Sequence, residues 1–266
     1  MKIQEIKCKS VLTKSKLPES DYCINPYLGC MHNCSYCYAR FMRRFTNHPE
    51  RWGEFVDVKV NAAEVLKKQM ARHPKRGVIL IGSVTDAYQP LEIKYGITRT
   101  ILQELLPYDF PISILTKSDL VTRDIDLLRQ FKECEVGLTI TTLDAKVAKS
   151  FESYAATPEK RLNALFELRR AGIRTYAFVG PILPGLTDLR SIFLALCGKV
   201  DFVMAESLNT RCGNWSEIEE ALKKDYPQFL SLFESSRKSS FWNDVEIEVR
   251  QLSDEFNIPL KGFYRH

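Results

Sequence analysis

The sequence predicts an α/β protein whose core is a partial (β/α)6 barrel, followed by a helical extension at the carboxyl end. Short apolar, β-branched runs alternate with amphipathic segments about six times along the chain. Such regular alternation favours a parallel sheet with helices on its outside. Six units of this kind can close partway into a barrel, which places chemistry at the carboxyl ends of the strands. The composition, 45% hydrophobic, is typical of a globular protein with a large core.

Each expected strand is a short apolar run, and each expected helix has an amphipathic pattern between start and stop signals. Strands are expected within residues 22–29, 77–86, 110–118, 135–142, 173–185 and 201–207. Helices are expected within residues 61–74, 95–108, 119–134, 157–172 and 188–200. The clearest helix has Thr157 as N-cap, Pro158 at its first position and Gly172 just past its end.

The chain is expected to form a single domain over residues 1–266, with a core of about 20–210. Its length alone suggests roughly two domains, but α/β barrels of this size often form one. Residues 211–266 are expected to be a helical carboxyl-terminal extension, with helices near 216–235 and 241–256 before a short tail.

The amino-terminal segment is charged throughout and lacks the apolar stretch of a signal peptide. Apolar runs such as residues 78–82 are too short to span a bilayer. We therefore expect a cytoplasmic protein with no membrane partner. The net charge of +5 permits an anionic substrate but does not demand nucleic acid.

Three of the eight cysteines, Cys30, Cys34 and Cys37, lie within one short segment. Thiolates are soft ligands that suit zinc or iron–sulfur clusters. Structural zinc requires four protein ligands, so His32 or Cys23 would have to complete a zinc site. A 4Fe–4S cluster held by three cysteines keeps one iron open for a small-molecule ligand, which an enzyme can use. Disulfides are not expected in a chain of this length without an export signal.

The Cys-x3-Cys-x2-Cys spacing after the first strand, with an aromatic residue just before the last cysteine, resembles the radical S-adenosylmethionine (SAM) signature. Residues 24–40, 83–92 and 115–128 together resemble the branch of that superfamily that contains spore photoproduct lyase. The resemblance runs from about residue 8 to about residue 210. It implies a partial barrel, a 4Fe–4S cluster and reductive cleavage of SAM to methionine and a 5′-deoxyadenosyl radical. That radical removes hydrogen from an unknown substrate, and a reductant such as ferredoxin or flavodoxin supplies the electron.

The resemblance also implies which residues hold SAM. Each has a structural alternative, such as shielding the cluster from water, capping a turn or carrying a solvated charge. Tyr36, and less strongly Tyr38, would lie near the adenine, which a flat ring can stack against. Lys117 would meet the carboxylate of SAM as an ammonium partner. The residues expected at the amino group, ribose and adenine are Ser83, Thr85, Asp86, Thr139, Thr141 and Ile182.

Glu206, Asn209 and Arg211 follow the sixth strand, where substrate would lie, although caps and ion pairs explain them equally well. One departure from the branch is Ser83, which stands where the lyase carries a hydrogen-donating cysteine. Repair of spore photoproduct by the known mechanism is therefore not expected. Cys212 offers a thiol from another direction, although a lone cysteine is more often inert.

Residues 38–45 interleave arginines with Phe41 and Phe45. Such a surface suits nucleic acid, through phosphate contacts and base stacking. In a helix, however, the two phenylalanines would lie four residues apart and pack inward, leaving the arginines solvated. Nucleic acid is therefore a possible partner only. The alternative function is a non-catalytic nucleic-acid-binding protein with a structural zinc or iron–sulfur site.

Overall fold

A sheet of eight strands, seven of them parallel, forms the centre of the computed structural model, which describes residues 1–266. The parallel strands are β3 (Tyr22–Ile24), β6 (Ile79–Ile81), β7 (Ile112–Thr116), β8 (Cys134–Thr139), β9 (Arg174–Ile182), β10 (Phe202–Ser207) and β11 (Leu260–Tyr264). Their order across the sheet is β11-β10-β9-β8-β7-β6-β3, and the antiparallel β2 (Leu12–Lys14) forms the other edge. Because β2 and β11 do not pair, the barrel is partial, as expected.

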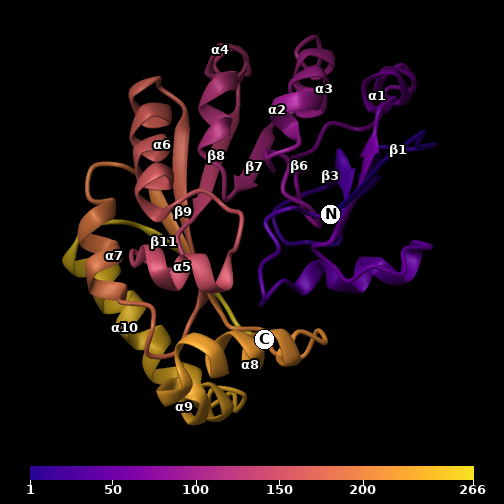
Figure 1. Cartoon of the computed structure of the whole chain (residues 1–266). Coiled ribbons are helices and arrows are strands. Elements are labelled where there is room, and N and C mark those ends of the chain that lie inside the picture. Colours follow the sequence, from indigo (N-terminus) through magenta and orange to yellow (C-terminus); the bar gives the residue numbers. More distant parts are fainter.

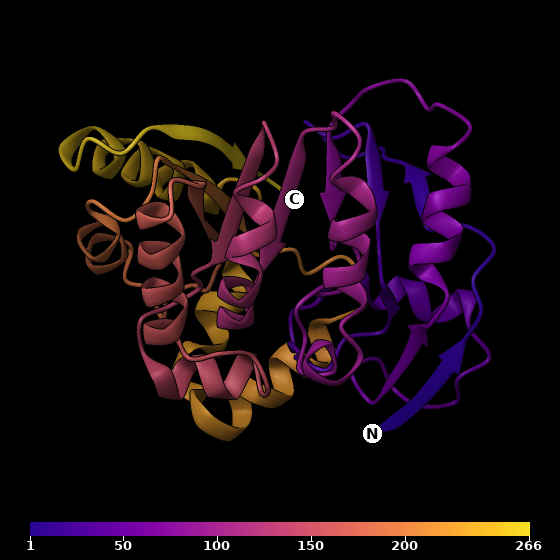
Figure 2. The same ribbon diagram turned by 90° about the horizontal axis from the view of Figure 1, so that it is seen from above.

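Helices line the outer side of the curved sheet, as the view from above shows (Figure 2). Between the strands lie α1 (Ala62–Met70), α2 (Glu92–Tyr95), α3 (Ile97–Leu105), α4 (Ile125–Leu128), α5 (Ala145–Phe151), α6 (Pro158–Arg170) and α7 (Leu189–Leu196). The 3-10 helices η1 (Tyr38–Phe45) and η2 (Asp119–Asp124) precede β5 (Phe55–Lys59) and α4. After β10 come α8 (Trp215–Asp225), η3 (Pro227–Phe229), α9 (Leu230–Ser235) and α10 (Phe241–Glu255).

The expected α/β barrel and its helical carboxyl-terminal segment are confirmed. The caps of α6 agree with the sequence, because Thr157 accepts from the Lys160 amide and Gly172 has a φ of +80°. No sequence prediction covered β1 (Lys2–Ile6), β2, β5 or α5. The tail after the last helix also carried none, and it forms β11, which adds a seventh parallel strand beside β10.

The segment expected as the first strand, residues 22–29, forms two strands that belong to different sheets. Pro26 separates β3 from β4 (Tyr27–Leu28), because proline supplies no amide hydrogen to continue a ladder. Strand β4 pairs with β5 (Phe55–Lys59), which in turn pairs with β1 (Lys2–Ile6) in a small three-stranded sheet. The cysteine loop therefore starts from the junction of the two sheets.

Aromatic side chains fill part of the space on the inner side of the barrel. Tyr176 stacks on Phe202 with ring centroids 5.0 Å apart, and both belong to a small cluster with Met204. Gly137 on β8 makes room for Tyr176, because a Cβ there would lie 2.2 Å from the tyrosine ring. A larger cluster of 54 buried residues forms the main hydrophobic core.

Gly137→Ala should therefore destabilise the protein by about 1–3 kcal/mol, the usual cost of overpacking a tight interior. The added methyl group would have to displace the Tyr176 ring, which is held between Phe202 and the β7 strand. Urea denaturation followed by circular dichroism measures the change. Gly262→Ala, also in a strand, is the matched control, because a Cβ there would lie no closer than 3.4 Å to any neighbouring atom and no positive φ opposes alanine. Equal effects at both positions would contradict the prediction for Gly137.

Candidate active site

The carboxyl ends of the parallel strands meet at one end of the barrel, where α5, α8 and the carboxyl terminus also lie (Figure 1). The cysteine loop follows β4 at this end and leads directly into η1. The other residues that the sequence singled out are close to the ends of β6, β7, β8, β9 and β10. The structure thus brings the cysteine loop and the strand ends to one place.

The three cysteines lie on one short loop, and a turn brings the Cys37 backbone back to that of Cys34. Burial, followed by nearby negative charge, raises the pKa of Cys30, and burial raises that of Cys34 to about 12. The Cys37 amide donates to the Cys34 carbonyl at 3.1 Å. The Trp52 indole Nε1 donates to the Cys37 Sγ at 3.2 Å. Three thiols and one N–H donor therefore form a sulfur-rich, largely buried centre.

Zinc gains no support from this geometry. No group of three or more His, Cys, Asp or Glu side chains is arranged to hold a single metal ion. His32, considered as a fourth ligand, instead has its Nδ1 at 3.3 Å from the Asp86 Oδ2. Cys23, the other candidate, lies buried in β3.

A buried ionic network beside Cys34 centres on Glu152, which the sequence did not single out. Its carboxylate pairs with Arg161, and the hydroxyls of Tyr36 and Thr141 donate to it. Glu152 and Arg161 are only 2% and 1% exposed, so neither charge is solvated. Burial alone would raise the pKa of Glu152, but Arg161 and then Lys117 hold it at about 2. Glu152 also forms an isolated β-bridge with Cys34.

Lys117 follows β7, and its ammonium has no carboxylate within ion-pair distance. Its Nζ lies over the Tyr36 ring at 5.6 Å from the centroid. Burial alone would lower the pKa of Lys117, but negative charge at Cys34 and Glu152 holds it above its usual value. This cation is therefore available for an anionic ligand.

Asp86 links the loop after β6 to the end of β7. Its Oδ1 accepts from the Thr116 hydroxyl at 2.7 Å, and its Oδ2 accepts from the Lys117 amide at 2.8 Å. The Tyr88 amide donates to the same carboxylate at 2.9 Å. Burial alone would raise the pKa of Asp86, but His32, Thr116 and the Lys117 amide hold it well below its usual range. The carboxylate is thus occupied by partners within the chain.

Ser83 and Thr85 are both buried, and each contacts the segment before the cysteines. The Ser83 Oγ accepts from the Asn25 side-chain amide at 3.0 Å. The Thr85 hydroxyl donates to the Gly29 carbonyl at 2.6 Å. Tyr38 donates its hydroxyl to the Ser83 carbonyl while its side chain remains partly exposed.

The tyrosine hydroxyls and the ends of β8 and β9 complete the predicted SAM residues. Burial, and then the charge of Glu152, raises the pKa of Tyr36, and burial also raises that of Tyr38. Thr139 is buried, and its carbonyl accepts from Arg161 at 3.0 Å. Ile182 is buried at the end of β9 and pairs in register with Ser207 of β10.

The residues expected near the substrate follow β10. Glu206 pairs with the His266 Nε2 at 2.7 Å, and the Asn209 Oδ1 accepts from the Arg211 amide in a local turn. Arg211 has no side-chain partner, and it is exposed. The capping alternative therefore describes Asn209, the ion-pair alternative describes Glu206, and Arg211 is exposed shortly after β10.

A fully buried asparagine, Asn214, ties this segment to the cysteine loop. Its Nδ2 donates to the carbonyl of Tyr36 and to the carbonyl of Asn209, both at 2.8 Å. Nearby, Arg40 at the start of η1 pairs with Glu217 of α8 at 2.5 Å. These contacts connect the segment after the first barrel strand to the segment after the sixth. We call them the Asn214 clasp.

The inward packing expected for the phenylalanines of η1 is wrong. Phe41 and Phe45 are 40% and 63% exposed, and the Arg44 guanidinium lies over both rings. The reason is that η1 is a 3-10 helix, in which residues four apart do not share one face. Its only buried residue is Ala39.

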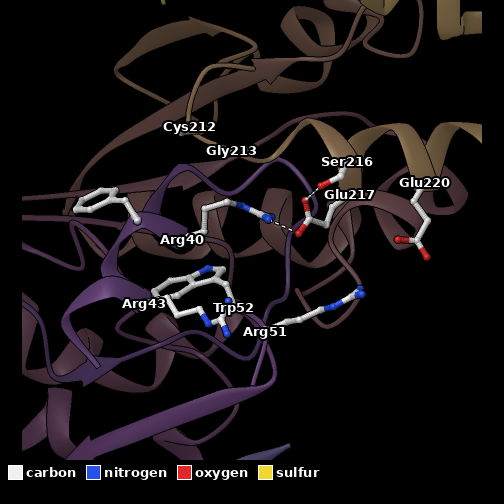
Figure 3. Close-up of a pocket in the computed structure, with 10 residues that line it drawn as sticks. Arg40, Arg43, Arg51, Trp52, Cys212, Gly213, Ser216, Glu217 and Glu220 are labelled. Atoms are coloured by element: carbon white, nitrogen blue, oxygen red, sulfur yellow. Dashed lines mark hydrogen bonds and ion pairs between the residues drawn. The ribbon is translucent and has the colours of Figure 1, made fainter. Parts of the chain in front are cut away.

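A cavity of about 540 Å³ opens between η1 and α8 (Figure 3). We call it the η1–α8 pocket. Its lining residues are Arg40, Phe41, Arg43, Arg51, Trp52, Cys212, Gly213, Ser216, Glu217 and Glu220. Figure 3 shows Arg43, Arg51 and Trp52 beside one another, across from Glu217 and Glu220. The sequence drew attention to Arg40, Phe41, Arg43 and Cys212, but not to Arg51 or Trp52.

Comparisons with known proteins agree on a single family. The sequence model described as the radical SAM superfamily matches residues 24–191. An uncharacterized protein of Methanocaldococcus jannaschii is 37% identical over 266 residues, which is 100% of this chain and 98% of that protein. An uncharacterized protein of Mycobacterium tuberculosis is 33% identical over 74% of this chain, and the match spans 60% of its own length. The Radical SAM Nalpha-GlyT isomerase of Pseudomonas phage M6 is 25% identical over 63% of this chain and 35% of that protein.

Solved structures show the same fold. Spore photoproduct lyase complexed with dinucleoside spore photoproduct superposes with a TM-score of 0.73 at 18% identity, covering 99% of this chain and 81% of that one. Streptococcus suis SuiB bound to precursor peptide SuiA gives a TM-score of 0.60 at 14% identity, over 92% of this chain and 48% of that one. In this chain, no helix has both the length and the apolar character needed to cross a membrane.

Proposed function

This chain belongs to the radical SAM superfamily and is a radical SAM enzyme, and we propose that it holds a 4Fe–4S cluster on Cys30, Cys34 and Cys37. The observation that carries this proposal is the cysteine loop itself. Its three neighbouring thiols and the N–H donor of Trp52 fit an iron–sulfur cluster, whose potential depends on hydrogen bonds to its sulfurs. Three thiolates leave one iron of such a cluster free to bind SAM.

When bound, the reduced cluster would supply the electron that cleaves SAM to methionine and a 5′-deoxyadenosyl radical, which abstracts hydrogen from the substrate. The chain's own residues bind SAM, orient it and keep water out. A reductant of the ferredoxin or flavodoxin type serves as the electron source.

Lys117 is the residue that we propose for the carboxylate of SAM. It is the unpaired ammonium at the carboxyl end of the sheet, and charge-assisted pairs with carboxylates are among the stronger hydrogen bonds. Tyr36 lies under the ammonium, and Glu152 fixes the Tyr36 hydroxyl. Glu152 is therefore a positioning residue for the SAM site, and it acts through Tyr36.

For the amino group of SAM, we propose Ser83 ahead of Thr85 and Asp86. The Ser83 Oγ accepts one hydrogen bond from Asn25 and keeps a second lone pair for an ammonium donor. Thr85 is engaged with both Gly29 and Gln89, and Asp86 is engaged with its own loop and β7. Asp86 would then act by holding the backbone of Lys117.

The other contacts with SAM stay predictions. Tyr36 and Tyr38 are proposed near the adenine, together with Ile182, and Thr139 near the ribose. The most accessible ring is that of Tyr38, which is 42% exposed.

For the substrate, nucleic acid is the class that we propose to test first. The support is twofold: a protein of the same fold was solved with a dinucleoside photoproduct, and Arg211, shortly after β10, is an exposed cation without an ion-pair partner. A peptide is the other outcome, because SuiB was solved with a precursor peptide. We also propose that residues 1–266 fold as one domain, since β11 pairs with β10 of the barrel.

An anaerobic assay tests the proposed function. The protein is reconstituted with iron and sulfide, then mixed with SAM and dithionite, and 5′-deoxyadenosine is measured. Wild-type protein should bind about four irons per chain and form 5′-deoxyadenosine, since a 4Fe–4S cluster is the proposed cofactor. Cys34→Ala should form none, and Cys197→Ala, which changes an exposed cysteine at the carboxyl end of α7, should behave as wild type. If fully reconstituted wild-type protein forms no 5′-deoxyadenosine, the proposed SAM cleavage is wrong.

A further inference from the structure

We propose that the η1–α8 pocket is the docking site of an acidic one-electron carrier and that electrons reach the cluster past Trp52. The proposal rests on the proposed function, because it requires a cluster on Cys30, Cys34 and Cys37. It goes beyond that function by assigning a docking surface and a route for the electron. The carrier loses one electron and the cluster gains it, so the step needs no further reactant.

Trp52 connects the pocket to the cluster ligands. Its side chain lines the pocket, and its Nε1 donates to the Cys37 Sγ at 3.2 Å. Only 7% of the residue is exposed, and its ring meets Phe55 edge-on with centroids 5.9 Å apart. The indole is therefore held in a fixed position between solvent and the cysteine loop.

The pocket approaches the cysteine loop from a side that SAM does not use. None of the residues proposed to contact SAM lines it, although they include eight positions on five segments. A substrate must come close to SAM to lose its hydrogen, whereas an electron donor only needs to approach the cluster. The pocket therefore suits an electron donor better than a substrate.

The charges of the pocket suit an acidic protein. Arg43 and Arg51 are exposed and have no carboxylate within ion-pair distance. Arg40 offsets Glu217 through their ion pair, which leaves Glu220 as the single unpaired acid. Arg44 adds a further cation on η1, beside the exposed rings of Phe41 and Phe45. Arginine and exposed aromatic residues are the types that dominate binding energy at protein interfaces.

Nucleic acid is the competing occupant, because arginines and aromatic rings also suit phosphates and bases. The contact between Trp52 and Cys37 decides between them. It connects the surface to a proposed cluster ligand, whereas none of the residues proposed to contact SAM lines the pocket.

The test compares two reductants on the reconstituted protein, with cluster reduction followed by stopped-flow absorbance. Reduced flavodoxin is the acidic carrier, and dithionite is a small reductant that needs no docking surface. The double variant Arg43→Glu/Arg51→Glu should slow reduction by flavodoxin about tenfold or more at low salt, the scale of lost electrostatic steering. Reduction by dithionite should not change. In wild type, added salt should slow the flavodoxin reaction because it screens the attraction.

Arg72→Glu/Arg129→Glu is the matched control, since it changes the net charge equally at two exposed arginines away from the pocket. It should leave both rates at wild-type values. A pocket variant that flavodoxin reduces at the wild-type rate overturns the proposal, as does an equal loss in the control. So does a pocket variant that loses binding of a single-stranded oligonucleotide while flavodoxin reduces it normally. If dithionite fails to reduce even the wild-type protein, the proposed function itself is wrong.

Trp52→Phe tests the contact between Trp52 and the cluster ligand separately, because phenylalanine keeps most of the packing and removes the N–H donor. Hydrogen bonds to cluster sulfurs favour the more negative, reduced state, so the variant should have a lower reduction potential. A redox titration followed by electron paramagnetic resonance measures that potential. An unchanged potential would show that the Trp52 N–H does not act on the cluster, and the proposed route would lose the contact on which it depends.

Discussion

Glu152→Gln should lower the free energy of unfolding by about 3–5 kcal/mol, the usual cost of removing one partner of a buried ion pair. Arg161, which is 1% exposed, would keep its charge without a carboxylate to balance it. The loss should appear in urea denaturation of the protein before cluster reconstitution. The same variant should also bind SAM more weakly, because the Tyr36 hydroxyl loses its anionic acceptor.

Two variants sharpen this test. Glu159→Gln, at an exposed position in the first turn of α6, should change stability by less than about 0.5 kcal/mol. Glu152→Gln/Arg161→Met should recover part of the loss, since it removes the buried charge that Glu152→Gln leaves uncompensated. If Glu152→Gln unfolds at the wild-type urea concentration, the ion pair does not stabilise the fold as described.

Lys117→Met should weaken SAM binding about 10- to 100-fold, because a hydrogen bond to a charged group contributes about 1.5–3 kcal/mol. Methionine has a similar length and no charge, so packing around Tyr36 would be largely kept. The measurement is equilibrium binding of SAM to anaerobically reconstituted protein. Binding that is unaffected would remove Lys117 from the SAM site.

Lys160→Met is the matched control for Lys117. The side chain of Lys160 is 64% exposed, and its ion pair with Asp119 is long, at 3.9 Å. It should bind SAM as wild type does. Lys117→Arg should retain part of the affinity, since it keeps the positive charge but changes its shape.

The features that the sequence predicted correctly depend on local patterns. The βα alternation follows from short-range periodicity, and the caps of α6 can be read within one turn. Lys117 was singled out by its resemblance to a lysine of the lyase branch and by its place directly after an apolar strand, and its contact with SAM stays a prediction. The cysteine spacing is local too, and the cluster that it implies is likewise a prediction.

The features that the sequence missed depend on distant contacts. Glu152 acquires its partner Tyr36 from 116 residues away, and no local signal separates it from a solvated glutamate. Trp52 matters only because folding brings its indole onto Cys37. For η1, the prediction assumed the 3.6-residue period of an α-helix. In a 3-10 helix, residues four apart do not lie on the same face.

The Asn214 clasp has a consequence for the order of events during synthesis. Asn214 follows Tyr36 by 178 residues, which corresponds to roughly 10–35 s of translation at about 5–20 residues per second. Throughout that interval the cysteine loop lacks the hydrogen bond from the Asn214 side chain to the Tyr36 carbonyl. For much of the same interval it also lacks the bridge between Cys34 and Glu152. The three thiols are therefore assembled only when most of the chain has emerged. If the chain holds the proposed cluster, iron delivered earlier would meet a cysteine loop that still lacks these contacts, so we expect the cluster to be assembled after translation.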